Sequence, residues 1–364
     1  MRIMFAGGGT GGHIYPALAV AEEIKQKRPE TEFLFVGGTR GVEQKIISSS
    51  GFPVKTIPVT ALPRTLSPDI FSFIGRLGVS IIKSRSYIRK FKPGVIMATG
   101  SYISGASMIA AISLGVPVVI QEQNSFPGIT NRKLGRYAKI VFLGFEDAGK
   151  YFGTNSEVHV TGNPVRKDIG AEPRETSAQA FGFDPTRKTV FVFGGSQGAQ
   201  KINKTFSEIV ESIADSGIQV LWQTGEKNAA KWASYDGSAD GRIRTYRYID
   251  NMAQAYAASD LVVARAGAMS ITEITVCGLP AVFVPLPTAA ANHQEHNART
   301  LVNAGAASVI FERELTPRLL EQEITRIVTS DERLAVMSKA SAKLGKKNAA
   351  RTIAGILIDR YGQN

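Results

Sequence analysis

Short apolar runs rich in β-branched and aromatic residues alternate with segments of helical period along almost the whole chain. Strand-like runs occur at Ile3–Ala6, Phe33–Val36 and Val95–Ala98, and a helical pattern at Ala17–Lys27 lies between the first two. Strands joined by helices pair in parallel, and a parallel sheet carries helices on both faces. A second series of the same kind follows a polar, linker-like stretch at residues 168–188. The chain is therefore predicted to be an α/β protein with two parallel sheets, and its 364 residues suffice for two domains.

The net charge of +12 is concentrated in the first part of the chain. Residues 1–165 hold 19 Lys and Arg against 10 Asp and Glu. A basic half of this kind favours an anionic partner: a phosphate-bearing substrate, a nucleic acid or an anionic membrane. The single cysteine, Cys277, excludes a disulfide scaffold and a cysteine-rich zinc site, and it fits a reducing cytosol.

Four turns rich in glycine and small residues each follow a predicted strand and precede a helix, at Gly7–His13, Thr99–Gly105, Gly194–Ala199 and Arg265–Glu273. Glycine lets the backbone approach a ligand, and the N–H groups at a helix start bind anions. The first turn matches the dinucleotide fingerprint, but the second strand ends in Val36–Arg40 without an acidic residue for a ribose, which argues against NAD. The third lacks the lysine of a Walker A loop. Together the four turns predict a protein that binds two phosphorylated ligands.

The segment Leu66–Lys92 combines an apolar stripe of helical spacing with a strongly basic remainder. An apolar face rimmed by cations suits the surface of an anionic bilayer. The alternative is an amphipathic helix packed on the first sheet with a solvated basic face, and the two interpretations can share the segment. The stripe consists of Ile70, Phe73, Ile74, Leu77 and Ile81, and the cations are Arg64, Arg76, Lys83, Arg85, Arg89, Lys90 and Lys92.

Seven short motifs occur in order between residues 8 and 298. They are Gly-Gly-Thr-Gly-Gly-His-x-x-Pro-Ala at 8–17, Gln-Glu-Gln-Asn at 121–124, Gly-Asn-Pro-Val-Arg at 162–166, Gly-Gly-Ser-Gln-Gly-Ala at 194–199, Arg-x-Gly-Ala-x-x-x-x-Glu at 265–273, Gly-Leu-Pro-Ala-x-x-x-Pro at 278–285 and His-Gln-x-x-Asn-Ala at 293–298. As a set they resemble the MurG family, the bacterial glycosyltransferases that add N-acetylglucosamine to lipid I in peptidoglycan synthesis.

The resemblance implies a GT-B fold, in which two Rossmann-like parallel-sheet domains face each other across a cleft. Residues 1–163 would bind the acceptor and the membrane, and residues 164–344 would bind UDP-N-acetylglucosamine, with a C-terminal helix at about 345–364 packing back on the first domain. The implied reaction is inverting transfer to the C4 hydroxyl of the N-acetylmuramyl unit of lipid I, which forms lipid II. The implied location is peripheral, at the cytoplasmic face of the bacterial cell membrane, with anionic phospholipid as a partner and no nucleic acid.

The same resemblance implies how the donor is bound. Ser196 and Arg166 would meet the diphosphate. Ile249 would meet the uracil through its backbone, and Glu273 would accept hydrogen bonds from the ribose hydroxyls. The alternative for Glu273 is a carboxylate that stabilises the helix dipole. The implied donor contacts are Thr10, Gly11, Gly12, Asn124, Arg166, Ser196, Ile249, Ala268, Met269, Ser270, Ile271, Thr272, Glu273 and Gln294, with Asn124 and Gln294 at the sugar and Met252 and Met269 packed beside the nucleotide.

The chemistry needs a stabilised leaving group and a base. N–H groups at a helix start together with Arg166 can stabilise the charge that grows on the departing UDP. No Asp-x-Asp motif occurs in the chain, so neither a metal site nor a cofactor is expected. His13, at a helix N-terminus that favours the neutral imidazole, is the candidate base, and the alternative is a structural histidine. The implied contacts of the acceptor diphosphate are Gly9, Gly100, Ser101 and Tyr102.

Two other functions stay open at this point. A UDP-N-acetylglucosamine 2-epimerase shares the implied fold and nucleotide, but the basic amphipathic segment and the two glycine turns of the first half favour a lipid diphosphate acceptor. A nucleic-acid-binding protein would fit the isoelectric point near 9.7. No zinc pattern, RNP motif or basic repeat supports it.

Overall fold

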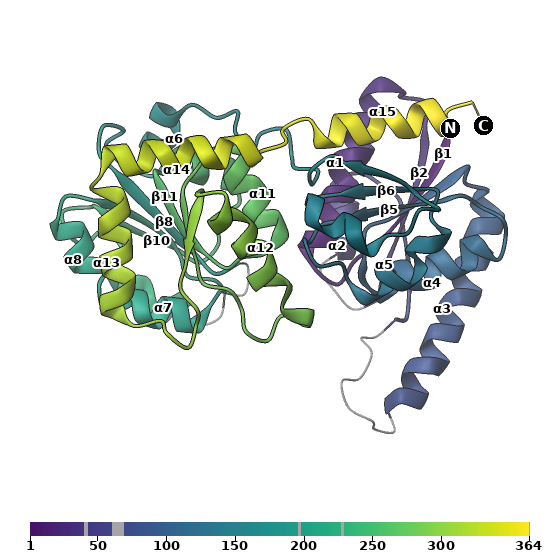
Figure 1. The fold of residues 1–364 in the computed structure, drawn as a ribbon, viewed down its shortest axis with the longest axis horizontal. Helices are drawn as coiled ribbons and strands as arrows, with labels where there is room; N and C mark the ends of the chain where they lie inside the picture. The colour runs from purple at the N-terminus through teal and green to yellow at the C-terminus, as the bar shows by residue number, and fades with distance from the viewer. Residues whose placement is uncertain (40–42, 60–68, 196–197, 227–228, 364) are drawn as a thin grey trace. The chain divides into compact units, whose positions relative to one another are not determined.

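Two parallel sheets organise the chain, as Figure 1 shows for a computed structural model that describes residues 1–39, 43–59, 69–195, 198–226 and 229–363. Unit 1 comprises Met1–Arg166 and Lys347–Asn364, and unit 2 comprises Lys167–Lys346. The boundary predicted between residues 163 and 164 lies three residues before the observed one. The prediction of an α/β chain with two parallel sheets is confirmed.

The sheet of unit 1 has seven strands in the order β3-β2-β1-β4-β5-β6-β7. All neighbours pair in parallel, and Ile3 of the central strand lies opposite both Phe33 and Val95. The strands at the centre of the sheet are buried on both faces, which explains why they read as continuous apolar runs. The strands are β1 (Arg2–Ala6), β2 (Glu32–Gly38), β3 (Val54–Ile57), β4 (Val95–Ala98), β5 (Val118–Glu122), β6 (Ile140–Leu143) and β7 (Glu157–Val160).

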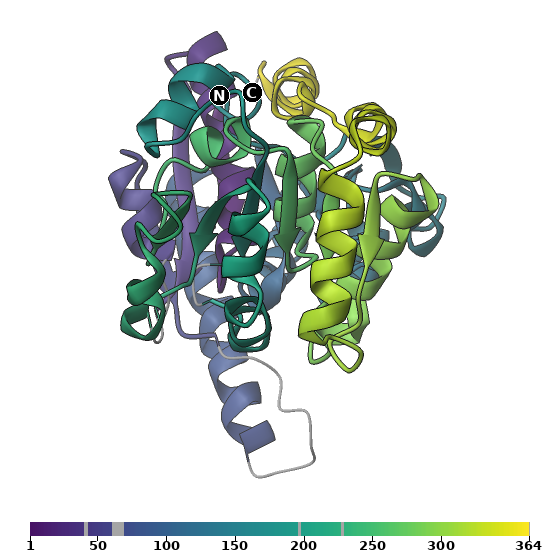
Figure 2. The ribbon, with the colours of Figure 1, turned by 90° about the vertical axis from the view of Figure 1, so that its left-hand side faces the viewer.

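Helices cover both faces of this sheet (Figures 1 and 2). They are α1 (Gly11–Lys27), α2 (Glu43–Ser49), α3 (Asp69–Phe91), α4 (Ser101–Ile112), α5 (Ile129–Leu134) and α15 (Ala349–Tyr361). Because side chains alternate along a strand, Ile3 and Phe5 belong to the core that includes α1 and α15. Met4 and Ala6 belong to the core on the other face, which includes α3 and α4.

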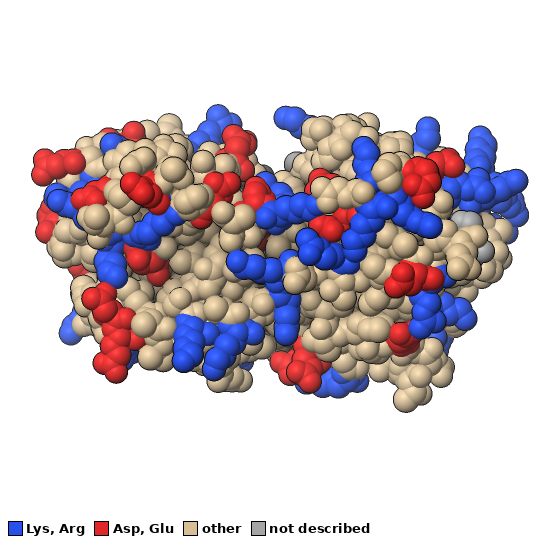
Figure 3. Space-filling view, turned by 90° about the horizontal axis from the view of Figure 1, so that it is seen from above, with Lys and Arg blue, Asp and Glu red and all other residues tan. Residues whose placement is uncertain are grey.

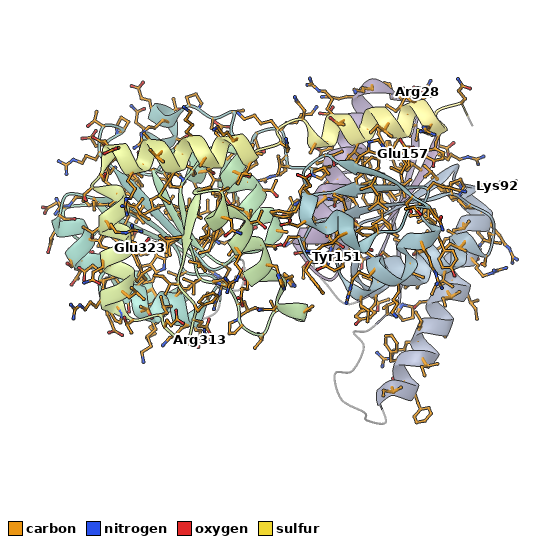
Figure 4. All side chains as sticks on the ribbon, in the orientation of Figure 1. Arg28, Lys92, Tyr151, Glu157, Arg313 and Glu323 are labelled. Atoms are coloured by element: carbon orange, nitrogen blue, oxygen red, sulfur yellow. The ribbon has the colours of Figure 1, made fainter. Side chains whose placement is uncertain are left out.

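Polar contacts fix the last helix of the chain on unit 1. Arg28, which follows α1, donates through Nη1 to the carbonyl oxygen of Gly362 at 2.6 Å. Arg360 donates through Nη2 to Glu157 Oε2 in β7, also at 2.6 Å. Figure 4 labels Arg28 and Glu157 on either side of α15. The C-terminal helix is therefore part of the same folded unit as the first strand.

The sheet of unit 2 has six parallel strands in the order β10-β9-β8-β11-β12-β13. One face packs on α7, α8, α13 and α14, and the other packs on α10, where Tyr256 contacts Phe191 and Phe193 of the central strand. The strands are β8 (Thr189–Phe193), β9 (Gln219–Gln223), β10 (Ile243–Tyr246), β11 (Leu261–Ala264), β12 (Ala281–Phe283) and β13 (Ala307–Val309). The helices are α6 (Arg174–Ala180), α7 (Gln200–Ser207), α8 (Val210–Asp215), α9 (Ala229–Trp232), α10 (Met252–Ala257), α11 (Ala268–Val276), α12 (His293–Asn303), α13 (Pro317–Val328) and α14 (Asp331–Leu344).

Each sheet reverses its strand order once, between β1 and β4 in unit 1 and between β8 and β11 in unit 2. Ligands of open parallel sheets bind outside the carboxyl ends of the strands at this switch point. The four turns singled out from the sequence are the segments that follow β1, β4, β8 and β11. The topology therefore places one pair of these turns at the switch point of each unit.

Candidate functional site

The loop after β1 is fixed against the loop after β4. A Cβ atom on Gly7 would stand 2.0 Å from Thr99 Oγ1, so only glycine fits there. The Thr99 hydroxyl donates to the carbonyl oxygen of His13 at 2.7 Å, which joins the first turn of α1 to the end of β4. Gly9, an expected acceptor contact, has a φ of 86° in the left-handed region that glycine adopts freely.

His13 is half-buried, with its ring against the loop after β4. Its Nδ1 atom lies 2.8 Å from the Thr99 carbonyl oxygen and 2.8 Å from Gln123 Oε1. A Cβ atom on Gly100 would stand 2.8 Å from both Cε1 and Nδ1 of the imidazole, and the φ of Gly100 is 108°. Glycine is needed at this position for space and for backbone conformation alike. The candidate base is thus held by groups from two separate segments of unit 1, residues 99–100 and Gln123.

The turn into α4 carries the other expected acceptor contacts, Gly100, Ser101 and Tyr102. Ser101 has a φ of 74°, which is strained for a residue with a side chain. Its Oγ atom accepts a hydrogen bond from the backbone N–H of Ile103 at 3.2 Å, and this offsets part of the strain. The ring of Tyr102 meets Phe73 of α3 edge to face, with 5.7 Å between the ring centres. The turn is therefore joined to α3.

A buried carboxylate, Glu122, organises the segment after β5 and is only 1 % exposed. Its Oε1 atom accepts from the backbone N–H and Nδ2 of Asn124, at 2.9 and 3.2 Å. Its Oε2 atom accepts from Asn131 Nδ2 at 2.8 Å and from the N–H of Gly128 at 3.3 Å. These donors compensate the burial of the charge. Glu122 belongs to the motif at 121–124, but a role in this motif was predicted only for Asn124. The available signal for Glu122 was a glutamate within a polar run at the end of a buried strand.

The start of α1 presents Thr10, Gly11 and Gly12. Thr10 is the N-cap residue, and its side chain makes no capping hydrogen bond. The first N–H groups of a helix have no acceptor within the helix, so they are open to an anion. Arg166, expected at the donor diphosphate, is the last residue of the first segment of unit 1, and its guanidinium lies 5.9 Å from the ring centre of Tyr15. Its place is in unit 1, and not in the donor domain that the sequence analysis began at residue 164.

The glycine loop after β8 is closely packed. A Cβ atom on Gly194 would stand 2.3 Å from the backbone nitrogen of Ala199. One on Gly198, which has a φ of 75°, would stand 2.4 Å from the carbonyl oxygen of Thr224. The loop therefore depends on glycine at both positions. Ser196, the expected diphosphate contact, lies outside the described residues.

Helix α11 begins four residues after β11 and carries six of the expected donor contacts. Ala268, Met269 and Ser270 form its first turn. Ile271 and Thr272 are 1 % and 7 % exposed, and Thr272 Oγ1 donates to the carbonyl oxygen of Ala268 at 2.8 Å. The side chains of Ile271 and Thr272 therefore serve the packing of unit 2. What α11 offers an anion is the N–H groups of its first turn.

Glu273 is half-buried in the second turn of α11. Its Oε2 atom accepts a hydrogen bond from the hydroxyl of Tyr256 at 3.0 Å. Tyr256 is 1 % exposed, because its ring packs on Phe191 and Phe193. The effect of a helix dipole fades beyond the first turn, which contains no acidic residue in α11. The position of Glu273 therefore does not fit the helix-dipole alternative. Its tyrosine partner could not be predicted from the sequence pattern.

The expected uracil contact, Ile249, lies between β10 and α10 and is 4 % exposed. Its backbone N–H donates to Oε1 of Gln223, the last residue of β9, at 2.8 Å. With this N–H group occupied, the backbone group of Ile249 that could meet the expected uracil is its carbonyl oxygen, which is an acceptor. Met252 follows closely as the first residue of α10.

Gln294, the second residue of α12, accepts at Oε1 a hydrogen bond from the backbone N–H of Leu286 at 2.9 Å. The amide is thereby oriented with Nε2 as its remaining donor group. Ala291 and Asn292, just before α12, have φ values of 51° and 56°, and such conformations cluster at ligand sites. The hydrogen bond from Asn292 Nδ2 to Glu295 Oε2, at 2.5 Å, is the main cause that lowers the pKa of Glu295.

The apolar stripe predicted on α3 is mostly covered. Leu77 and Ile81 pack against the core of unit 1, and Phe73 contacts Tyr102. Of the predicted stripe Ile74 is strongly exposed, at 57 %. The alternative of a helix packed on the first sheet is therefore confirmed for this face of α3.

A second apolar stripe on α3 faces solvent. Helical spacing alone does not separate it from the first stripe. It consists of Phe71, Ile74, Val79 and Ile82, which are 81, 57, 47 and 69 % exposed. Their spacing places them on one side of the helix, whose first turns project away from the sheet of unit 1 (Figures 1 and 2). Exposed cations follow on the same helix and just after it: Lys83, Arg89, Lys90 and Lys92. Among the described residues no helix is long and apolar enough to cross a bilayer, and Arg64 lies outside them.

Other charged surfaces are mixed. Figure 3 views the face that carries α14 and α15, and there Lys and Arg are interspersed with Asp and Glu on both units. Lys92 lies just after the C-terminal end of α3, the end opposite its projecting first turns (Figure 4). In the described part of the chain no group of three or more His, Cys, Asp or Glu side chains could hold a metal ion.

Family models match most of the chain. The glycosyltransferase family 28 N-terminal domain matches residues 3–143, and the C-terminal domain of the same family matches residues 189–353. A protein of Acetivibrio thermocellus is 38 % identical over 367 residues, which cover 99 % of this chain and 98 % of the relative. One of Bacillus pumilus is 40 % identical over 360 residues, or 98 % of each chain. Both are named UDP-N-acetylglucosamine--N-acetylmuramyl-(pentapeptide) pyrophosphoryl-undecaprenol N-acetylglucosamine transferase.

Solved structures show the same architecture. MurG of Acinetobacter baumannii superposes with a TM-score of 0.77 at 27 % identity, covering 98 % of this chain and 99 % of that one. A putative UDP-N-acetylglucosamine 2-epimerase of Listeria monocytogenes gives a TM-score of 0.71 at 15 % identity, covering 100 % and 96 %. At that identity the likeness shows the fold alone. The fold is therefore common to both activities considered from the sequence, whereas the relatives at 38 and 40 % identity are named as transferases.

Proposed function

The chain belongs to glycosyltransferase family 28, and we propose that its two units divide the work of a MurG-type transfer between them. It is a hexosyltransferase with the GT-B fold that uses UDP-N-acetylglucosamine and converts lipid I to lipid II in peptidoglycan synthesis. The observation that carries this function is the 38 to 40 % identity to the named transferases over almost the full length of the chain. The residue roles rest on the contacts within each unit.

Unit 2 binds the donor at the carboxyl ends of its strands. The glycine loop after β8, with Ser196, and the first turn of α11 bind the diphosphate through N–H groups, to which Arg166 adds its charge. Glu273 accepts from the ribose hydroxyls, and the carbonyl oxygen of Ile249 accepts from the uracil. Gln294 donates to the sugar. The hydrogen bonds of Glu273 with Tyr256 and of Ile249 with Gln223 support these roles, because they orient the groups in advance.

Unit 1 binds the acceptor and supplies the base. The glycine turns after β1 and β4, which include Gly9 and residues 100–102, receive the acceptor diphosphate. Residues 10–12 at the start of α1 and Asn124 also contact UDP-N-acetylglucosamine. His13 takes the proton of the attacking hydroxyl. The support for this role is the position of the imidazole in the first turn of α1, between the two turns that would hold the acceptor.

The transfer step needs no reactant besides UDP-N-acetylglucosamine and the acceptor. The C4 hydroxyl oxygen of the acceptor forms a bond to the anomeric carbon of N-acetylglucosamine from the face opposite UDP, so the configuration is inverted. The bond between that carbon and the β-phosphate oxygen breaks, and its electron pair leaves with UDP. The hydroxyl proton passes to Nε2 of His13. The fixed N–H groups and Arg166 stabilise the charge on UDP, which is the role a metal ion has in other transferases.

A transfer assay tests this function directly. The full chain is expected to transfer labelled sugar from UDP-N-acetylglucosamine to a lipid I analogue, at a rate that EDTA does not change. A control without acceptor separates the alternative, because a 2-epimerase would convert UDP-N-acetylglucosamine without it. Loss of transfer in EDTA that added Mg²⁺ restores would contradict the proposed metal-independent chemistry.

The exposed stripe of α3 attaches the enzyme to the cytoplasmic face of the cell membrane. Phe71, Ile74, Val79 and Ile82 supply apolar surface, which partitions into the boundary between headgroups and acyl chains. Lys83, Arg89, Lys90 and Lys92 add attraction to anionic phospholipid, about 1 kcal/mol for each cation near the surface. The acceptor is linked to a membrane lipid, which explains why the enzyme would need a surface that binds the membrane.

Replacing Phe71, Ile74 and Ile82 with serine is expected to abolish most co-sedimentation with anionic liposomes and to leave transfer to a short-chain, water-soluble acceptor analogue unchanged. These side chains are exposed, so folding is not expected to suffer. Leu319→Ser with Val336→Ser in unit 2, at 39 and 61 % exposure, is the matched control and should retain binding. Raised salt should weaken wild-type binding, because screening reduces the attraction of the cations. Undiminished sedimentation of the α3 variant would contradict the proposal.

A further inference from the structure

Three buried side-chain amides lie behind His13 in unit 1. Gln121 and Gln123, at the end of β5 and just after it, are 0 and 2 % exposed, and Asn163 is 0 % exposed. Gln121 Nε2 donates to Asn163 Oδ1 at 2.8 Å, and Asn163 Nδ2 donates to the carbonyl oxygen of Gln123 at 3.0 Å. The Asn163 side chain occupies space that a Cβ atom on Gly144 would need, at 2.2 Å from Oδ1. The amides therefore form a packed network and not a loose polar cluster.

The partners of Gln123 determine which end of its amide meets His13. Its Nε2 atom donates to the carbonyl oxygens of Thr99 and Gln121, at 2.8 and 2.9 Å, and it also contacts Gln121 Oε1. A carbonyl oxygen can only accept, so the atom next to those oxygens is the nitrogen. The other atom, Oε1, is then the one that lies 2.8 Å from His13 Nδ1.

The same reasoning determines where the proton of the imidazole lies. Nδ1 has two neighbours at hydrogen-bond distance, the Thr99 carbonyl oxygen and Gln123 Oε1, and both are acceptors. A neutral imidazole has one N–H group and one lone pair. Nδ1 must therefore carry the hydrogen, and Nε2 carries the lone pair that a base needs.

We infer that Gln123 is a positioning residue of the transfer reaction: it holds His13 as the neutral tautomer with the proton on Nδ1 and keeps Nε2 ready to accept. This inference rests on the proposed role of His13 as the base. A catalytic histidine in hydrolases is oriented in a similar way, but there by a carboxylate. Here the partner is an uncharged amide whose own orientation Thr99 and Gln121 enforce.

Nitrogen NMR of the wild-type protein with labelled histidine tests the tautomer without any variant, because protonated and unprotonated ring nitrogens differ in chemical shift. For neutral His13 we expect a protonated Nδ1 and an unprotonated Nε2. Assignment of the proton to Nε2 would overturn the inference, whatever the role of His13 in catalysis.

Gln123→Met keeps the volume of the side chain and removes all its hydrogen bonds. We expect kcat to fall about tenfold or more, the loss of one well-placed hydrogen bond, while the KM for the donor and the affinity for UDP stay at wild-type values. The Thr99 carbonyl oxygen remains as an acceptor for Nδ1 in this variant, so its nitrogen spectrum should show a smaller excess of the Nδ1-protonated tautomer than the wild-type spectrum. Gln219→Met is the matched control, since Gln219 is 3 % exposed and makes three comparable hydrogen bonds, to Asp184 and Thr189 in unit 2.

The outcomes separate the inference from the function on which it rests. A kcat of Gln123→Met equal to that of Gln219→Met, or an unchanged tautomer in Gln123→Met, would overturn the positioning role. If the tautomer is as inferred and depends on Gln123, but His13→Ala keeps its kcat, the assignment of His13 as the base fails instead.

Discussion

Glu273→Ala is expected to raise the KM for UDP-N-acetylglucosamine by about ten- to a hundredfold, because charge-assisted hydrogen bonds contribute about 1.5–3 kcal/mol. An ionised carboxylate offers about four acceptor positions, and the hydrogen bond from the Tyr256 hydroxyl at 3.0 Å uses one of them. The KM for the acceptor should change little, since unit 1 binds it. Steady-state kinetics with each substrate varied in turn measure both constants.

Two further variants decide how Glu273 acts. Tyr256→Phe removes only the hydrogen bond that orients the carboxylate and should raise the donor KM about fivefold, the equivalent of roughly 1 kcal/mol. Glu273→Gln keeps the shape of the side chain but loses its charge. The donor KM of this variant should therefore lie between that of Glu273→Ala and that of the wild type. Donor kinetics of Glu273→Ala indistinguishable from wild type would mean that the contact with Tyr256 is only structural.

The order of strands and helices could be predicted because each element carries its own periodicity. The residues at which helices and strands begin and end were harder to predict. The pattern at Ala17–Lys27 marked only the later part of α1, which begins at Gly11. Gly11, Gly12 and Pro16 are poor helix formers, so the sequence pattern did not predict the first turns of the helix. The first turn of α1 is bonded to Thr99 through the carbonyl oxygen of His13, 86 residues away, and sequence periodicity does not report such a contact.

Helix α3 shows the same limit for a surface. Its sequence contains two apolar stripes, and periodicity alone does not tell which one meets the sheet. Leu77 and Ile81 lie against unit 1, whereas Phe71 and Ile82 face solvent. The choice is made by the opposing helix α4, whose buried Ser104 and Ser107 allow close packing.

The glycine turns and His13 were recognisable as a site because their chemistry is local. The partners that prepare the site were not recognisable, since each lies on another element of the fold. Gln123 meets His13 across 110 residues, and Tyr256 reaches Glu273 from another helix. A buried glutamine or tyrosine reads as ordinary packing until the structure shows which polar atom it supports.

His13→Ala is expected to lower kcat by about a hundredfold or more, the usual contribution of a general base, while UDP affinity stays within about twofold of wild type. The rate of the wild type should fall on the acid side through a single protonation, because an imidazolium has no lone pair at Nε2. The rate of the variant should lack that dependence. Kinetics over a range of pH and calorimetric UDP binding make the comparison.

His159→Ala is the matched control for the loss of an imidazole in unit 1. His159 is also partly exposed, bonds Glu157 at 2.8 Å and stacks on Phe142 at 5.8 Å, but it lies on the edge strand β7. Its removal should leave kcat and the acid limb unchanged. If His13→Ala behaves in the same way, the bonds of His13 to Thr99 and Gln123 serve only to join α1 to β4 and β5, and the proton of the acceptor must leave by another route.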